Sequence, residues 1–155
     1  MHDKKSDALA FLKANHMGVL ATCGSDGMPH ASTVFCIADD DFNIYFLTLI
    51  SSRKYKALRE NPHVAFVVST GDIPQTLQIE GTAEEIQSDA LKLKLSAKLV
   101  DLLLEKSKRY FAPIVKLDSA EIVLMWIKPA WVRWGDYSVL DTTGTANVQS
   151  EITLS

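Results

Sequence analysis

Short apolar runs rich in β-branched residues, separated by tight-turn signals, constrain the fold of this 155-residue chain most. The runs "HMGVLATCG" and "MPHASTVFCIA" are joined by "SDG", a turn signal that predicts a β-hairpin. A second turn, "DDDFN", leads into the run "IYFLTLI". We therefore predict three successive antiparallel strands that form a meander.

Four further runs continue the strand pattern: "HVAFVVST", "TLQIEGTAEEI", "SAEIVLMWIKP" and "AWVRWGDYSV". Gly81 lies inside the second of these runs, where a glycine marks a bulge or a close approach of backbone or ligand. A short amphipathic helix is predicted from Ser6 to Asn15, where it would cover a barrel end. A long surface helix is predicted from Ser88 to Phe111. Its leucines recur at helical spacing and are expected to face the core: Leu91, Leu95, Leu99, Leu102 and Leu103.

Six or seven mostly antiparallel strands interrupted by helices predict a mainly β fold with α additions. A sheet of this size avoids open edges by closing, so we expect a β-barrel. The length suits one domain, which we place at residues 1–139. Residues 140–155, rich in Thr, Ser and Gly, are expected to form a flexible C-terminal tail.

Composition excludes several classes of function. A net charge of -3 argues against broad nucleic-acid binding, which relies on many Lys and Arg contacts to phosphate. No apolar run is long enough for a membrane span, and the polar start "MHDKKSDALAF" lacks the apolar region of a signal peptide, so we expect a cytoplasmic protein. Cys23 and Cys36 are interpreted as reduced strand cysteines, because neither has disulfide-framework or metal-site spacing. No metal site is expected.

The segment "TLISSRKYKALRENP", Thr48 to Pro62, has an unusual helix start. Ser51 or Ser52 is a good N-cap, and the first turn then carries Arg53 and Lys54 at the positive end of the helix dipole. A bound anion such as phosphate would explain two cations there, because backbone N–H groups, hydroxyls and cations would converge on it. Alternatively, both side chains point into water and the serine is only a cap.

The order of these segments resembles a known family. "GVLATCGSDGMPHASTVF", "IYFLTLISSRKYKALRENPHVAFVV" and "LQIEGTAEEI" are similar to the FMN-binding split β-barrel family typified by pyridoxamine 5'-phosphate oxidase, and to its short members of the general-stress-protein type. The likeness spans about Phe11 to Ile86. Its spacing is carried by Thr48, Ser52, Arg53, Lys54, Asn61, Pro62 and Gly81. The resemblance implies a six-stranded antiparallel split barrel, a homodimer with FMN in a groove between the subunits, and flavin-dependent oxidoreductase activity.

The resemblance also implies site residues. Arg53 and Lys54, with Ser52, would hold the FMN phosphate, which Leu47 and Thr48 would border. The stretch Ser32, Thr33, Val34 and Phe35 would lie along the isoalloxazine ring and offer it backbone hydrogen bonds. The family's glutamine corresponds to Thr76, and Gln78, with the same strand parity, is a candidate to replace it.

Because of two departures from the family pattern, the resemblance supports the cofactor site and does not support the substrate site. Ser32 and Ile37 stand where the oxidase has an arginine and a lysine, and "AWVRWGDYSV" lacks its Arg-x-His region, so the vitamin substrate site is not supported. The alternatives are a reductase that uses a deazaflavin cofactor and a non-enzymatic flavin-binding or haem-binding stress protein.

His30 is interpreted as a structural strand histidine. Trp126, Trp131 and Trp134 are expected in the core or an interface, and Arg133 is either an ion-pair partner or a contact to a substrate anion.

Overall fold

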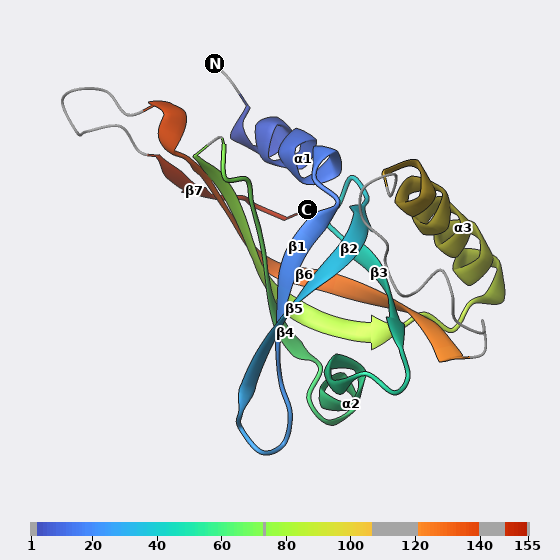
Figure 1. Ribbon diagram of the computed structural model, residues 1–155. Coiled ribbons are helices and arrows are strands. Elements are labelled where there is room, and N and C mark those ends of the chain that lie inside the picture. Colours follow the sequence, from blue (N-terminus) through green and yellow to red (C-terminus); the bar gives the residue numbers. More distant parts are fainter. Residues whose placement is uncertain (1–2, 73, 107–120, 140–147, 155) are drawn as a thin grey trace.

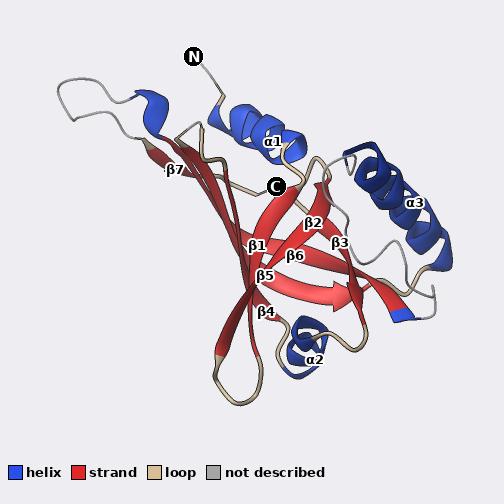
Figure 2. Cartoon of the chain, viewed as in Figure 1, coloured by secondary structure: helices blue, strands red, loops and turns tan. Residues whose placement is uncertain are grey.

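The computed structural model describes residues 3–72, 74–106, 121–139 and 148–154 (Figure 1). Strands dominate these residues, and helices lie around them (Figure 2). In chain order the elements are α1 (Lys4–Ala14), β1 (Met17–Cys23), β2 (Pro29–Ala38), β3 (Ile44–Leu49), α2 (Arg53–Glu60), β4 (His63–Ser69), β5 (Gln75–Glu85), α3 (Asp89–Lys106), β6 (Ile122–Asp136), a 3-10 turn η3 (Tyr137–Val139) and β7 (Gln149–Glu151).

The strands form a closed barrel. Their order is β3-β2-β1-β4-β5-β6-β7, and an additional pairing between β3 and β6 closes the first six into a ring. Every pairing in the described residues is antiparallel. The predicted fold class, a six-stranded antiparallel barrel with helical additions, is confirmed.

Strand alternation divides the apolar residues between the barrel interior and its outer surface. The interior cluster takes alternate residues such as Leu20, Phe46 and Phe66. Helix α1 covers one end of the barrel as predicted, although it begins at Lys4. Its residues Phe11 and Leu12 join the interior cluster, and the Phe11 ring lies 4.9 Å from that of Trp134.

Helix α3 covers part of the outer surface. Leu99 and Leu103 are buried, and Leu99 belongs to a second cluster with Ile37, Leu47 and Leu124 from β2, β3 and β6. The leucine stripe therefore faces the sheet as predicted, except for the exposed Leu91. The predicted helix residues 107–111 lie outside the described residues.

One long strand replaces the two strands predicted at residues 119–139. In the β5–β6 register, Glu80 pairs with Trp131 and Gly81 pairs with Pro129, which leaves Ala130 as a bulged residue. Before the bulge the inward-facing residues of β6 have odd numbers, and after it they have even numbers. The sequence of this one strand therefore shows two alternation patterns, which predicted two strands. Gly81 is required here, because a Cβ at this position would lie 2.0 Å from the carbonyl oxygen of Lys128.

The end of the chain corrects the predicted tail. Residues 140–147 lie outside the described residues, but Gln149–Glu151 form β7 against β6, and Ile152 belongs to the interior cluster. Alternating apolar residues at this end gave a strand signal that the polar composition masked. No helix in the described ranges is long and apolar enough to cross a membrane.

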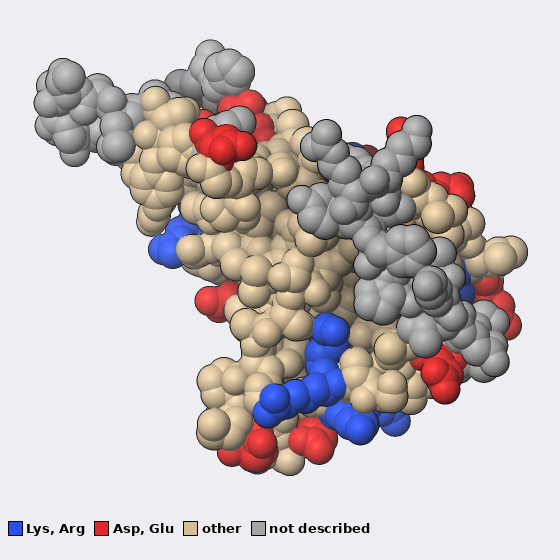
Figure 3. Space-filling model, viewed as in Figure 1, with Lys and Arg blue, Asp and Glu red and all other residues tan. Residues whose placement is uncertain are grey.

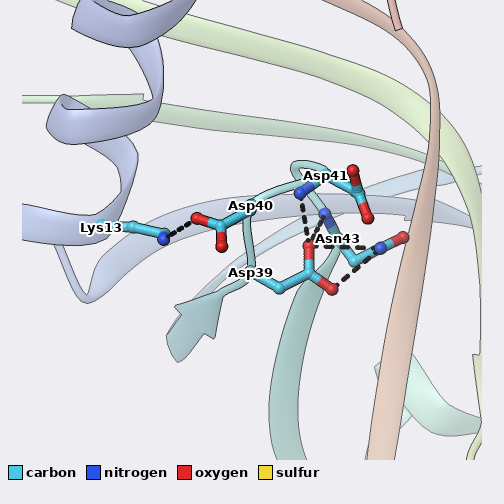
Figure 4. A network of polar contacts seen from close by, with 5 residues as sticks. All are labelled: Lys13, Asp39, Asp40, Asp41 and Asn43. Atoms are coloured by element: carbon cyan, nitrogen blue, oxygen red, sulfur yellow. Dashed lines mark hydrogen bonds and ion pairs between the residues drawn. The ribbon is translucent and has the colours of Figure 1, made fainter. Parts of the chain in front are cut away.

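The predicted turn between β2 and β3 is held by its own side chains (Figure 4). The Asp39 carboxylate accepts hydrogen bonds from the backbone N–H groups of Asp41 and Asn43, each at 3.0 Å. Lys13 of α1 pairs with Asp40. The turn therefore ties the β2–β3 corner to α1.

Candidate functional site

The start of α2 is fixed by a hydroxyl pair. Ser52 is the N-cap, because its Oγ accepts a hydrogen bond from the backbone N–H of Tyr55 at 3.2 Å. The Thr48 hydroxyl, at the end of β3, lies 3.0 Å from the same Oγ and is buried. The structure thus selects Ser52 over Ser51 as the cap and joins it to Thr48.

Two cations stand at this helix start. Arg53 and Lys54 form no ion pair or side-chain hydrogen bond with the described residues, and the first turn contains no acidic residue. Arg53 is exposed, whereas Lys54 is half-buried, and burial lowers the pKa of Lys54. Basic side chains gather over the α2 region of the surface (Figure 3). A half-buried cation that no described residue pairs with favours an anionic ligand.

The backbone of β2 has an open edge beside this helix start. The β2–β3 ladder ends at the pair Cys36 and Phe46, and extending its register would place Val34 opposite Thr48. The Cys36 N–H donates to the backbone carbonyl oxygen of His16, which lies on the β1 side of β2. Because the backbone groups of successive strand residues point to opposite sides, the N–H and C=O groups of Thr33 and Phe35 point toward β3. In the described residues they have no ladder partner there, because the pairing between β2 and β3 stops at Cys36 and Phe46.

The side chains of the predicted ring-binding stretch lie on both sides of the sheet. Val34 joins the interior cluster, and Phe35 packs at the second cluster, where its ring lies 5.7 Å from His16. Ser32 is half-buried and Thr33 is exposed. The side chain of Leu47 is buried in the second cluster under α3, so only its backbone is available to border a ligand.

Thr76 and Gln78 lie elsewhere in the barrel. Both are on β5, which is three strands from β2 in either direction around the six-stranded ring. Leu77 and Ile79 face the interior, so the side chains of Thr76 and Gln78 point outward. Within one chain, the structure therefore does not bring these two residues together with Arg53 and Lys54.

The outer surface of β1, β4 and β5 carries a groove of about 480 Å³. Strand pairing aligns Ala31, Ala21 and Ala65 in one row across β2, β1 and β4. Next to this row, Met17 and Val19 are exposed apolar side chains. The three alanines, with Met17 and Val19, thus form an apolar floor on this outer face.

Comparison with known families agrees with this arrangement. The sequence matches the family described as "Pyridoxamine 5'-phosphate oxidase" over residues 5–134. The chain belongs to this family. A curated pyridoxine/pyridoxamine 5'-phosphate oxidase from Salinibacter ruber is 37% identical over 70 residues, which are 45% of this chain and 33% of the relative. The chain thus spans about a third of the length of the curated oxidases that it matches.

Solved structures share the fold and differ in the ligands that they name. A heme-binding protein from Mycobacterium smegmatis has a TM-score of 0.72 and 18% identity, over 99% of this chain and 59% of that protein. An F420 reductase has a TM-score of 0.61 and 26% identity, over 79% and 93%. A FAD-binding protein from Mesorhizobium loti has a TM-score of 0.64 and 22% identity, over 82% and 90%.

Sequence reasoning missed a contact on the outer face of this oxidase-family barrel. Arg133 of β6 donates hydrogen bonds to Gln78 of β5, and its guanidinium lies 5.2 Å from the Trp131 ring. Neither of the two predicted roles of Arg133 included this pair. Its signal was the two-residue spacing of Trp131 and Arg133, which becomes informative once the bulge fixes the register.

The remaining candidates have structural roles. Trp134 lies in the interior, and Trp126 lies under α3 and donates from Nε1 to Asn43 at 2.9 Å. Cys36 is a free, buried thiol whose pKa is raised to about 12 by burial, and Cys23 is also free. Among the described residues, no group of three or more His, Cys, Asp or Glu side chains is placed to hold a metal ion.

Proposed function

We propose that this oxidase-family protein binds FMN and acts as a flavin-dependent oxidoreductase. The observation that carries the proposal is the start of α2, where Arg53 and Lys54 lack partners in the described residues beside a hydroxyl pair. A phosphate there would meet the positive end of the helix dipole together with two cations. Such a site distinguishes FMN from riboflavin, which has the same ring and no phosphate.

The open edge of β2 supports a place for the ring. Thr33 and Phe35 offer backbone donors and acceptors at the point where β3 leaves β2. A bound flavin supplies the electron-transfer chemistry. The chain's own residues would hold the phosphate, fix the ring against β2 and match its polar edge with backbone groups. Flavins are the ligands that the family binds, which agrees with this fit.

The position of Gln78 supports the proposal of a homodimer. It points outward from the strand opposite β2, so Gln78 and the β2 edge of the same chain face away from each other. Both can contact one flavin only if they come from two subunits. The exposed apolar floor on β2, β1 and β4 is a surface suited to subunit contact. We therefore propose that the flavin lies between two copies of this chain.

The first experiment is the absorption spectrum of the purified protein. A yellow protein with flavin bands that releases FMN on denaturation would support the proposal. Two similar structures name other ligands, F420, which is a deazaflavin, and heme, and they motivate the alternatives. A colourless protein that gains a Soret band with haem, or that binds only the deazaflavin, would overturn the FMN assignment.

The phosphate site can be tested by removing its two cations. We expect Arg53→Ala with Lys54→Ala to weaken FMN binding by about a hundredfold or more, since each charge-assisted hydrogen bond contributes roughly 1.5–3 kcal/mol. Riboflavin binding should change little, because riboflavin has no phosphate. Dissociation constants from flavin fluorescence titration measure both ligands.

The matched control is Lys56→Ala with Arg59→Ala, which removes the same charge from exposed positions of the same helix. This control should bind FMN as the wild type does. Equal losses of FMN and riboflavin in the Arg53 and Lys54 variant would show that the two cations are structural.

A further inference from the structure

We propose that Arg133 is a positioning residue that holds the Gln78 amide so that its NH₂ group is presented as a hydrogen-bond donor to the flavin ring. The inference rests on the proposed flavin binding and deepens it. Gln78 was a candidate cofactor contact from the family resemblance. The pairing with Arg133 adds which atom of Gln78 faces the ligand and what keeps it there.

Two hydrogen bonds converge on one amide oxygen. Arg133 Nε donates to Gln78 Oε1 at 3.1 Å, and Arg133 Nη2 donates to the same oxygen at 2.5 Å. A guanidinium has only donors, so the amide atom that faces it must be the oxygen. The amide nitrogen therefore points away from Arg133, and no described residue accepts a hydrogen bond from it.

Strand pairing and an aromatic ring hold Arg133 in place. Gln78 and Arg133 are directly opposite in the β5–β6 register, and the guanidinium lies 5.2 Å from the Trp131 ring. Glu151 of β7 is opposite Arg133 on its other side, yet no ion pair links them. The half-buried guanidinium thus binds a neutral amide although a carboxylate is its cross-strand neighbour.

The orientation has a chemical consequence for ligand binding. An unrestrained glutamine can turn its amide over and present either an acceptor or a donor. The two hydrogen bonds from Arg133 occupy the acceptor oxygen, which leaves Gln78 as a donor on the outer face of β5. The polar edge of an isoalloxazine ring carries carbonyl oxygens, which accept such a bond. Because Gln78 faces away from the β2 edge of its own chain, the flavin that it contacts would be the one bound at the partner's β2 edge.

Three variants separate positioning from simple stability. Arg133→Met releases the amide, Arg133→Lys keeps a donor for Oε1, and Gln78→Glu keeps an acceptor for Arg133 while it removes the donor. We expect Arg133→Met and Gln78→Glu to weaken FMN and riboflavin by the same factor, about tenfold, because the lost contact is to the ring. Arg133→Lys should recover most of the affinity.

Titration by flavin fluorescence is combined with thermal unfolding of the flavin-free variants. Gln78→Glu should keep the wild-type melting temperature, since a carboxylate also accepts from Arg133. The control is Lys128→Met, which removes another β6 cation, one that pairs with Glu84 and lies over Trp126, and which should leave flavin binding unchanged.

Wild-type flavin affinity in Gln78→Glu would overturn the donor role, and equal losses in Arg133→Met and Arg133→Lys would overturn positioning. Either result leaves the proposed function standing if the wild type binds flavin. A wild type that binds neither FMN nor riboflavin would overturn both proposals.

Discussion

At the scale of single residues, Ser52 connects the fold to the candidate site. Its hydroxyl caps α2 and contacts the buried hydroxyl of Thr48, so one side chain orders both the end of β3 and the start of the helix. Arg53 and Lys54 follow directly, and their positions depend on where the helix begins. The cap at Ser52 therefore also fixes where the two cations of the proposed phosphate site stand.

Ser52→Ala is expected to destabilise the protein by about 1–2 kcal/mol, because it removes an N-cap and leaves the Thr48 hydroxyl without its contact. Urea denaturation measures the change. Ser51→Ala is the control, since Ser51 is exposed and does not cap α2. Equal effects of the two substitutions would contradict the role of Ser52.

At the scale of elements, β6 organises the barrel. It pairs with β3 and β5 at once, and its bulge at Ala130 lets both halves face the interior despite the change of parity. Gly81 on β5 makes room for the bulged backbone. The glycine that the sequence singled out thus accommodates protein backbone.

We expect Gly81→Ala to cost at least about 1–3 kcal/mol, because a Cβ would lie 2.0 Å from the Lys128 carbonyl oxygen and the bulge would have to shift. Gly71→Ala is matched to it, since a Cβ at Gly71 meets nothing within 4 Å. Thermal or chemical unfolding compares the two. A Gly81→Ala protein as stable as Gly71→Ala would show that β6 has room to move.

Sequence reasoning succeeded where information is local. Runs of β-branched residues predicted the first strands, and the serine before Arg53 predicted the helix cap. The bulge at Ala130 and the pair formed by Gln78 and Arg133 both depend on the register between β5 and β6. That register cannot be predicted from the sequence of either strand alone. The burial of Ile152 was not predicted, because the polar residues around it indicated a flexible tail.

At the scale of the whole molecule, the homodimer that we propose would use the exposed apolar floor on β2, β1 and β4 as its subunit contact. We expect Ala65→Arg to convert the proposed homodimer to monomers and to weaken flavin binding, because Ala65 is an exposed member of the floor, at the β4 end of the alanine row. The monomer should keep its melting temperature in the flavin-free state. Light scattering and flavin titration measure the two effects.

Ala90→Arg is the control for adding a cation, because Ala90 is exposed at the start of α3. This variant should stay a dimer in light scattering. A wild-type protein with the mass of one 17.2 kDa chain when loaded with flavin would contradict the dimer. A dimer that survives Ala65→Arg would place the subunit contact on another face.

The closing role of β6 also sets the order in which the chain can fold. Ile44 of β3 meets its partner Ile127 only after most of the chain has been made, and β5 waits for the same strand. During synthesis, the edges of β3 and β5 thus keep unpaired backbone N–H and C=O groups until β6 pairs with both strands. Pairings so distant in sequence form slowly, so a nascent chain stalled before Ile122 would be prone to aggregation.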